Sequence, residues 1–423
     1  MTTITNFLSR IFQDKLIDDH RSPAFSFDLF EYHVDFLAPN YLFFVQIYVI
    51  LSLQMMAGCI LSIIMYYGIL LDSSKDGVKS YQGYLVGYGV VIPVALWLPF
   101  QLLDALDIRG VAFRLGLACL PMTITLRCLE SMYGFVRGGG GCTNNNEMIS
   151  LWDYILESGW IVKPQYDPTT GKVYPLTWRR FGQAFGCHVY WLLMFAASYQ
   201  VMEPFRFCPF STSVEAPNQV WLAWDVGHWY NTFIQATMMN ATLAFSVSGV
   251  ALLAALYTGV AFDHAITNNP MFASTSPSDF WGRRWNKMIH TGLKQGIYKP
   301  VRWNTGNRTL ASIAAFVVSG LYHEFVWIIL FVPTSAQLAE GMHPDNAHCC
   351  LSCYCHGWMG KQLLFFGWNG VLIALEYALG DKISQWTKPL PQWLKNHLVV
   401  LLSLPVGHLF TADMTMSGCF ESI

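Results

Sequence analysis

Long apolar segments separated by polar stretches dominate the 423-residue chain. A helix needs about 20 apolar residues to cross the hydrocarbon core of a bilayer, and roughly eight segments approach that length. These segments are residues 42–71, 85–103, 111–135, 185–202, 233–262, 310–332, 362–379 and 398–410. The pattern therefore predicts an all-α fold, a polytopic transmembrane bundle of roughly eight helices.

Several of these segments have features that constrain their placement. The first and the fifth are long enough to be tilted or to contain a turn. The third carries Arg114, Arg127 and Glu130. Charged side chains in a spanning helix face protein or water rather than lipid, so we expect this helix inside the bundle. The last segment is short and contains His408, and we expect it to be only partly inserted.

Composition and charge agree with a membrane protein. The chain is 53% hydrophobic and only 12% charged, whereas soluble globular proteins carry about 25% charged residues. The formal net charge is −2, so the overall charge does not indicate a nucleic-acid partner. The positions of the basic residues are more informative than their number.

Residues 1–40 differ from the rest of the chain. They mix charged residues with Phe and Leu, and they lack the uninterrupted apolar core and small-residue cleavage site of a secretory signal peptide. We therefore predict an amphipathic N-terminal arm lying on the membrane. Residues 41–423 contain no internal repeat, and we predict a single multi-pass membrane domain there.

Three polar loops are rich in Lys and Arg, namely residues 72–80, 136–180 and 263–309. The predicted spans place all three on one side of the membrane. Cytosolic loops carry an excess of Lys and Arg, so the pattern predicts that these loops face the cytosol.

Two polar tracts allow alternative interpretations. Residues 138–141 are four glycines, which favours a flexible linker; a phosphate-binding loop would need a following Lys-Ser or Lys-Thr. Residues 343–356 are rich in Cys and His. They lack two separated Cys-x-x-Cys pairs, so we favour disulfides or unpaired thiols over a metal site, and we assign no metal ligands.

The octet of residues 279–286, DFWGRRWN, is the most distinctive polar stretch. Arg283 and Arg284 carry the planar guanidinium groups that suit phosphate binding. Trp281 and Trp285 have large apolar faces and one polar edge. Asn286 offers both a hydrogen-bond donor and an acceptor. A loop that only anchors the protein at the membrane interface is the simpler alternative.

His323 lies within the apolar segment 310–332. A titratable group at membrane depth suggests a functional site, whereas the alternative is a histidine that links two helices by a hydrogen bond. Glu324 points about 100° away from His323 on a helix, so we do not expect the two to pair. Glu376 is interpreted as a structural partner on a neighbouring helix. The other histidines are interpreted as packing or interfacial residues: His188, His228, His264, His290 and His408.

Several of these motifs together resemble the eukaryotic wax synthase family of membrane-bound O-acyltransferases. The resemblance lies in Pro-Met-Phe at 270–272, Ser-Pro-Ser at 276–278, the octet, and Tyr-Lys-Pro-Val-Arg at 298–302. The segment Ser-Gly-Leu-Tyr-His-Glu at 319–324 resembles the family's Ser-Gly/Ala-x-x-His-Glu segment. The Phe-x4-Trp-Asn pattern also resembles a motif of sterol and diacylglycerol acyltransferases. The family-like core spans residues 263–332.

This resemblance implies a reaction and a location. A wax synthase-like protein would transfer a fatty acyl group from acyl-CoA to a long-chain or lipophilic alcohol in the endoplasmic reticulum membrane, forming a wax-type ester. Transfer of an acetyl or short acyl group to a terpenoid or sterol hydroxyl is the alternative within the class. A membrane transporter is the alternative from another class, but it would spread charged residues through several spans.

The resemblance and the chemistry together assign roles to the octet and to His323. The neutral imidazole of His323 would be the general base that removes the alcohol proton. Asn286 would donate a hydrogen bond to the thioester carbonyl or orient CoA. The remaining substrate-binding candidates are Asp279, Phe280, Trp281, Arg283, Arg284, Trp285 and Lys287. Acyl-CoA would be a cosubstrate, with no resident cofactor, and the other partners would be the alcohol and membrane lipid. The signatures Gly-x-Ser-x-Gly and His-Glu-x-x-His are absent from the sequence.

Overall fold

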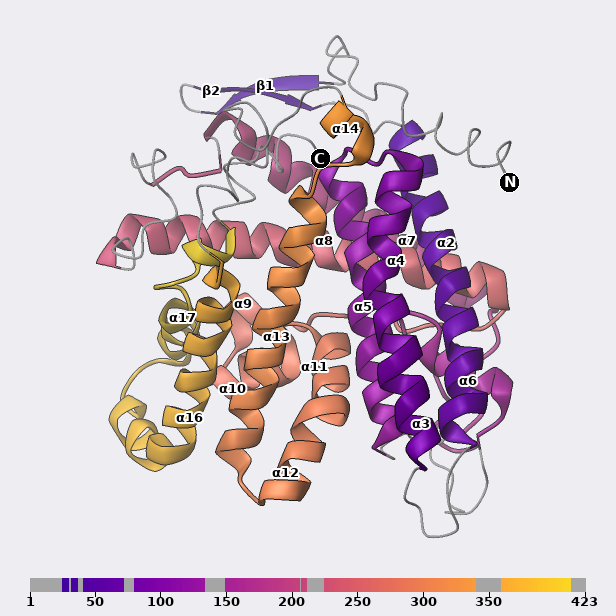
Figure 1. Ribbon diagram of the computed structural model, residues 1–423. Coiled ribbons are helices and arrows are strands. Elements are labelled where there is room, and N and C mark those ends of the chain that lie inside the picture. Colours follow the sequence, from indigo (N-terminus) through magenta and orange to yellow (C-terminus); the bar gives the residue numbers. More distant parts are fainter. Residues whose placement is uncertain are drawn as a thin grey trace.

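A computed structural model describes most of the chain (Figure 1). The described residues are 25–29, 32–36, 41–71, 80–133, 149–205, 207–210, 224–339 and 359–411. Residues 138–141, the Cys- and His-rich stretch 343–356 and most of the N-terminal arm lie outside them. The predictions for these parts of the chain stay predictions.

Helices make up most of the described structure, with very little sheet, which confirms the predicted all-α class. In the N-terminal half they are α2 (Tyr41–Met65), α3 (Tyr81–Val86), α4 (Ile92–Leu106), α5 (Val111–Met132), α6 (Leu151–Ser158) and α7 (Trp178–Met202). In the C-terminal half the longer ones are α8 (Val226–Thr258), α13 (Arg308–Phe331), α16 (Lys361–Thr387) and α17 (Gln392–Ser403). Shorter ones are α9 (Pro270–Ala273), α10 (Pro277–Asp279), α11 (Lys287–Leu293), α12 (Lys299–Thr305) and α14 (Ser335–Ala339).

A small antiparallel hairpin is the one sheet within the described residues. It pairs β1 (Phe25–Leu29) with β2 (Tyr32–Phe36). Val34 of β2 is buried, with 1% of its surface exposed, and β2 contacts α7. This described part of the N-terminal arm therefore packs on the helical domain.

Six helices within the described residues are long and apolar enough to cross a membrane. They span Phe44–Leu70, Tyr81–Leu106, Phe113–Met132, Val226–Thr258, Arg308–Phe331 and Lys361–Ile383. Each overlaps a predicted span, so a multi-pass helical membrane protein is confirmed. Two of the eight predicted spans need correction. Residues 185–202 form part of α7, whose first turns carry polar and charged residues, and they are not among the six candidate spans. Residues 398–410 hold the end of the 12-residue α17, a turn and the start of a separate short helix, which agrees with the expectation that this segment is not fully inserted.

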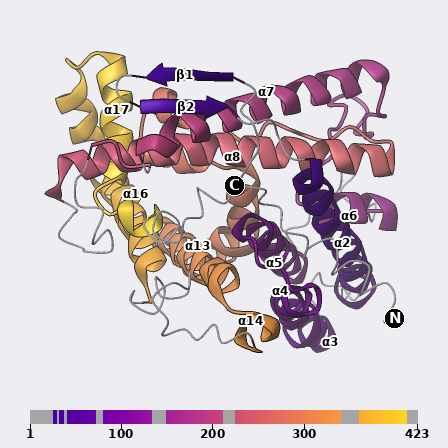
Figure 2. The same cartoon turned by 90° about the horizontal axis from the view of Figure 1, so that it is seen from above.

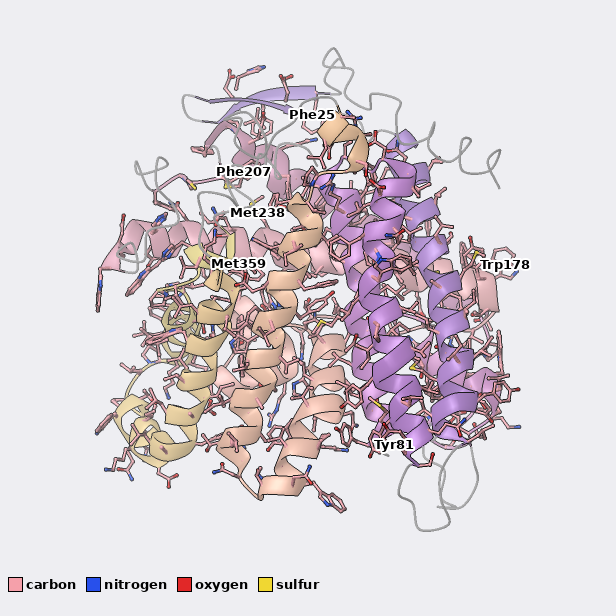
Figure 3. The ribbon with its side chains drawn as sticks, in the orientation of Figure 1. Phe25, Tyr81, Trp178, Phe207, Met238 and Met359 are labelled. Atoms are coloured by element: carbon pink, nitrogen blue, oxygen red, sulfur yellow. The ribbon has the colours of Figure 1, made fainter. Side chains whose placement is uncertain are left out.

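The long helices run in two directions. Figures 1 and 2 show α2, α4, α5, α13 and α16 extending in a common direction, with α8 lying across them. Helix α7 packs antiparallel beside α8. His188 near the middle of α7 hydrogen-bonds Ser248 of α8 at 3.1 Å, and the later Tyr199 hydrogen-bonds the earlier Thr242 at 3.0 Å. Large aromatic side chains point outward at the edges, as Tyr81 and Trp178 show in Figure 3, with 83% and 88% of their surface exposed.

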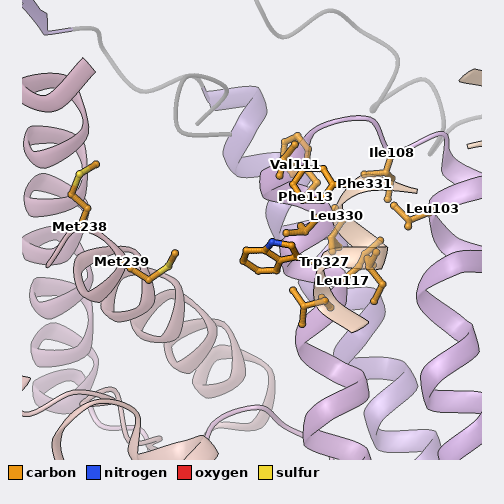
Figure 4. Packing of buried hydrophobic residues seen from close by; sticks show 14 of the residues in the cluster. Leu103, Ile108, Val111, Phe113, Leu117, Met238, Met239, Trp327, Leu330 and Phe331 are labelled. Atoms are coloured by element: carbon orange, nitrogen blue, oxygen red, sulfur yellow. The ribbon is translucent and has the colours of Figure 1, made fainter. Parts of the chain in front are cut away.

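An apolar core joins α4, α5, α8 and α13. Leu103 of α4, Leu117 of α5 and Met238 of α8 are almost fully buried in it. Trp327 and Leu330 project from α13 into the same cluster, as Figure 4 shows. Because close packing favours one arrangement of the helices, this core holds α13 in place against α5.

The charged residues of α5 face the protein interior, as predicted. Arg127 pairs with Glu130 at 2.7 Å, with 8% and 6% of their side chains exposed. Arg114 donates hydrogen bonds from Nε to the carbonyl of Ile108 at 2.9 Å and from Nη1 to the carbonyl of Leu330 at 3.1 Å. This arginine therefore satisfies a carbonyl at the C-terminal end of α13, which would otherwise be buried without a partner.

Candidate active site

A cavity of about 690 Å³ lies among the long helices and the short helices that follow α8. Most of its wall is apolar, and residues from α2, α5, α8, α13 and α16 contribute to it. His323 and Asn286 both line it. The two residues assigned the central chemical roles therefore share one cavity, although 37 positions separate them in the sequence.

His323 has a defined orientation on α13. Its Nδ1 lies 2.7 Å from the carbonyl oxygen of Ser319, one turn earlier. A carbonyl only accepts hydrogen bonds, so Nδ1 carries the proton, and Nε2 of the neutral ring is a bare acceptor. The ring stacks on Phe366 of α16 at 4.3 Å between centroids and packs against Phe410 at 5.5 Å. The imidazole is held in place, and its basic nitrogen is available to a ligand.

Asn286 also has one end fixed. Its Oδ1 accepts a hydrogen bond from the backbone N–H of Ile289 at 3.0 Å, which caps the N-terminus of α11. The oxygen of the side-chain amide is therefore occupied by its hydrogen bond to the helix N-terminus. The NH₂ group is then the end that can donate to a ligand in the cavity. This orientation suits a hydrogen bond to a carbonyl oxygen.

The aromatic residues of the octet lie in the interior rather than at an interface. Phe280, Trp281 and Trp285 line the cavity and pack on one another, with centroids between 5.0 and 6.0 Å apart. The indole N–H of Trp281 donates to Oδ1 of Asn369 on α16 at 3.0 Å. Residues Phe280–Arg284 form a π-helical turn, a local geometry often found at functional sites. An interfacial anchor does not require this packing.

Three of the predicted binding residues do not line the cavity within the described structure: Asp279, Arg284 and Lys287. The guanidinium of Arg284 donates from Nε to Asp279 at 2.7 Å and from Nη1 to the carbonyl of Asn268 at 3.2 Å. Asp279 also accepts from the backbone N–H of Thr275 at 3.1 Å. The geometry therefore favours an internal brace for Asp279 and Arg284, and the assignment of Arg284 to phosphate is revised.

Glu376 strengthens this brace from a second helix. Its carboxylate accepts hydrogen bonds from the backbone N–H of Ser278 at 2.8 Å and from the Ser278 hydroxyl at 2.6 Å. Ser278 immediately precedes the octet. Glu376 thus fastens the start of the octet to α16, which agrees with the structural role predicted for it.

Replacing Asp279 with asparagine is expected to lower the stability of the folded protein by about 1–3 kcal/mol at neutral pH. Burial alone would raise the pKa of Asp279, but the hydrogen bonds from Arg284 and Thr275 outweigh it and lower the pKa below its ordinary value of 3.8. The carboxylate therefore stabilises the fold above that value, and this stability is lost as pH falls through the lower folded-state pKa.

Thermal unfolding of detergent-solubilised protein measures the difference. The wild-type melting temperature should exceed that of Asp279→Asn at pH 7, and the gap should narrow below about pH 4. Lys287→Gln is the control, because Lys287 is an exposed residue next to the octet. Equal melting temperatures for wild type and Asp279→Asn at pH 7 would contradict the bracing role.

Further basic and polar residues line the cavity that were not assigned from the sequence. They are His290, Lys294, Tyr298, Arg308 and Tyr377. Their spacing in the sequence could have indicated a shared polar face of a helix. Such a face has a polar residue at every fourth position, as do Asn286, His290, Lys294 and Tyr298. Burial and, secondarily, the charge of Lys294 lower the pKa of His290, so its imidazole is neutral at pH 7.

Helix α13 has the same kind of periodic face. Arg308, Ser312, Ser319 and His323 all line the cavity from this helix. Residues three or four apart share one face of a helix, so this face lines the cavity from the exposed first turn at Arg308 to the aromatic packing at His323. Fifteen residues separate these two, which corresponds to about 22 Å along a helix.

Several other buried acidic and histidine residues contact partners other than His323 in the described structure. Glu324 accepts hydrogen bonds from the backbone N–H groups of Gly360 and Gln362 at 3.0 and 2.8 Å, at the start of α16. His228 and His408 stack on each other with centroids 5.4 Å apart. His188 lines the cavity from α7 and hydrogen-bonds Ser248 and Tyr48.

The fold and the cavity define a multi-pass membrane protein with an internal, largely apolar cavity that an oriented histidine lines. Residues 264–342 match the membrane bound O-acyl transferase family. This segment contains the octet, the cavity-lining face of α11 and all of α13. The resemblance to the wax synthase family of membrane-bound O-acyltransferases is therefore confirmed, and it rests on this segment.

Several plant proteins are similar to parts of the chain. A probable long-chain-alcohol O-fatty-acyltransferase 9 of Arabidopsis thaliana is 44% identical over 69 residues, which is 15% of this chain and 20% of that protein. A probable long-chain-alcohol O-fatty-acyltransferase 6 is 39% identical over 153 residues, 34% of this chain and 36% of that protein. The acyl-CoA–sterol O-acyltransferase 1 of the same plant is 30% identical over 128 residues, 29% of this chain and 30% of that protein.

These matches span about a fifth to a third of the relatives' own lengths. The family match at residues 264–342 covers the part of the chain that forms the cavity wall around the octet and His323. Helices α2, α5, α7, α8 and α16 also contribute to the cavity, but the family match does not cover them.

Proposed function

We propose that the protein is an acyl-CoA-dependent O-acyltransferase that transfers a fatty acyl group to a long-chain or otherwise lipophilic alcohol. The observation that carries this proposal is the orientation of His323. Its Nδ1 proton is committed to the Ser319 carbonyl, so Nε2 remains basic in an apolar cavity that Asn286 also lines. This arrangement suits removal of a proton from an alcohol.

The proposed reaction needs few groups. Nε2 of His323 takes the proton from the alcohol as its oxygen attacks the thioester carbonyl carbon. The NH₂ group of Asn286 donates a hydrogen bond to the oxygen on which negative charge develops. The carbon–sulfur bond then breaks, the ester forms, and the CoA thiolate takes the proton from the imidazolium. Thiolate is a good leaving group, so no covalent acyl-enzyme is needed.

The basic residues of the cavity suit the phosphates of CoA. Arg283, Lys294 and Arg308 are exposed and line the cavity. Arg308 lies about 22 Å along α13 from His323 by helix rise. A substrate whose phosphates bind at Arg308 must therefore carry its reactive carbon on a long arm, as acyl-CoA does. The loop that holds these residues would face the cytosol, and the protein would reside in the endoplasmic reticulum membrane.

Replacing both Arg283 and Lys294 with alanine is expected to raise the KM for acyl-CoA at least tenfold, because each charged hydrogen bond is worth about 1.5–3 kcal/mol. The KM for the alcohol should change little. Steady-state ester formation in microsomes, with one substrate varied at a time, measures both constants. The matched control is Lys287→Ala, which removes a nearby charge that does not line the cavity within the described residues. An unchanged KM for acyl-CoA in the double variant would exclude this binding site.

Ester formation by microsomes that contain the protein tests the proposed function directly. Labelled long-chain acyl-CoA or acetyl-CoA is supplied with a panel of fatty alcohols and sterols, and the products are identified chemically. Long-chain wax esters are the expected product. Acetylated or acylated sterols would favour the alternative that the similarity to a sterol O-acyltransferase suggests. Movement of a lipid across vesicles without any ester product would favour a transporter instead.

A further inference from the structure

A second polar group lies in the cavity at a distance from His323. Tyr48 of α2 and His188 of α7 both line it. The Tyr48 hydroxyl lies 3.3 Å from Nε2 of His188, and Nδ1 of His188 lies 3.1 Å from Oγ of Ser248 on α8. The imidazole stacks on Phe245, with centroids 5.1 Å apart. These side chains come from three helices, and the mechanism proposed above uses none of them.

The hydrogen-bond directions in this group follow from its last member. The Ser248 hydroxyl donates to the carbonyl of Phe245 at 2.8 Å. Its oxygen therefore accepts from Nδ1 of His188, which leaves Nε2 to accept the proton of Tyr48. With its proton committed, the Tyr48 oxygen can only accept a further hydrogen bond. It is therefore suited to a ligand group that donates one, such as a hydroxyl.

The position of this group follows from its contacts with α8. Gly249 of α8 packs directly against His188, since a Cβ atom added there would lie 2.9 Å from Cε1 of the imidazole. The other end of α8 lies near His323. There Gly407 packs against Thr232 of α8, and Phe410, which follows shortly after Gly407 in the chain, packs against His323. Thr232 and Gly249 are 17 residues apart on one helix, which corresponds to a distance on the order of 25 Å.

The wall between these two ends is mainly apolar. It includes Leu51 of α2, Met239 and Leu243 of α8, and Ile266. A long hydrocarbon chain that reacts at His323 can follow this wall. Polar groups in such a wall are costly unless they have partners, and a hydrogen-bonding site rejects ligands that leave its groups unpaired.

We propose that Tyr48 and His188 form a second subsite, which binds a hydroxyl group at the far end of a long-chain substrate. The proposal rests on the proposed acyltransferase function and adds to it a preference for hydroxylated chains. Either an α,ω-diol as the alcohol or an ω-hydroxyacyl group on CoA presents this chemistry. The reacting oxygen or thioester lies near His323, and the terminal hydroxyl donates to the Tyr48 oxygen.

Competition between substrates of equal chain length tests the subsite in microsomes. One arm compares a diol with the matching mono-alcohol, corrected for the two reactive ends of the diol. The other compares ω-hydroxyacyl-CoA with unsubstituted acyl-CoA. Wild type should prefer the hydroxylated substrate in one arm by about tenfold in kcat/KM, the value of one buried hydrogen bond. That arm identifies which substrate occupies the subsite.

Tyr48→Phe should abolish this preference, because it removes the oxygen that accepts the hydrogen bond from the terminal hydroxyl. Because the preference is a ratio measured on one preparation, loss of folded protein does not alter it. Tyr257→Phe is the matched control, because its hydroxyl also bonds across α2 and α8, to Ser52 at 3.0 Å, but it does not line the cavity within the described residues. A preference that persists in Tyr48→Phe, or no preference in wild type, overturns the subsite.

Thermal stabilisation of purified protein by the diol and by the mono-alcohol separates this proposal from the proposed function. The diol should raise the melting temperature more than the mono-alcohol, and Tyr48→Phe should remove the difference. This outcome would support the subsite even if no alcohol is esterified, in which case the acyltransferase proposal alone fails. Equal stabilisation by both compounds in wild type overturns the subsite.

Discussion

Replacing His323 with glutamine is expected to reduce ester formation by about 10²–10⁴-fold, the usual contribution of a general base. Glutamine has a similar reach, and its NH₂ group can donate to the Ser319 carbonyl as Nδ1 does now. It cannot take up a proton from an alcohol at neutral pH. The rate of wax ester formation at saturating acyl-CoA, per amount of folded protein, measures the effect.

The controls for this prediction separate catalysis from folding. His323→Gln should keep normal membrane insertion and an unchanged affinity for acyl-CoA. His397→Gln changes another half-buried histidine, one that packs against Tyr230 and Phe233 and does not line the cavity within the described residues. It should remain active. Turnover near the wild-type rate in His323→Gln would show that the histidine only links helices, and the proposed mechanism would be withdrawn.

Replacing Gly320 with alanine adds a single methyl group, and we expect this change to have the second large effect, on both stability and activity. A Cβ atom there would lie 2.8 Å from the Cα atom of Leu363 on α16. Backbone atoms cannot move aside locally, so α13 and α16 must separate, at a cost of about 1–3 kcal/mol. The separation would loosen the stacking of His323 on Phe366. We expect a lower melting temperature together with a loss of most of the activity.

Gly367→Ala is the matched control for this substitution. Gly367 lies on α16, and a Cβ atom added there meets nothing within 4 Å. This variant should keep the wild-type melting temperature and activity, or gain slightly in stability, because alanine favours a helix over glycine. If Gly320→Ala behaved like Gly367→Ala, the close approach of α13 and α16 would not matter for the site.

Most of the helical fold could be predicted because spanning helices must be long and continuously apolar. The burial of Arg114, Arg127 and Glu130 followed from the same physics, since charges on a spanning helix avoid lipid. The direction of α8 could not be predicted. Hydropathy measures the length of an apolar segment, whereas its direction depends on packing against distant helices.

The candidate site could be predicted in part. His323, Asn286 and the aromatic residues of the octet do line one cavity, as expected of residues that act together. Asp279 and Arg284 were assigned to substrate because charge near a membrane suggests a ligand, but their opposite charges five positions apart allowed an internal pair. Lys294 and Arg308 also line the cavity, but in the sequence they were counted only as loop charges.

The meeting of Tyr48 and His188 in one cavity had no signal in the sequence. These residues lie on two separate apolar helices, and each alone is typical of packing in a membrane protein. Their meeting in the cavity depends on how α2 crosses α8 and how α7 packs beside α8, which local patterns do not encode. Residues contributed by such distant segments are found only when the helices are placed in three dimensions.

The transverse direction of α8 bears on which molecules can enter the cavity. Helix α8 lies across α2, α4, α5, α13 and α16 (Figures 1 and 2). A hydrocarbon chain that follows the cavity wall along α8 would therefore run across those helices rather than parallel to them. We expect a single-chain alcohol, which can turn freely, to enter such a cavity more readily than a phospholipid, whose head group is held at the membrane surface.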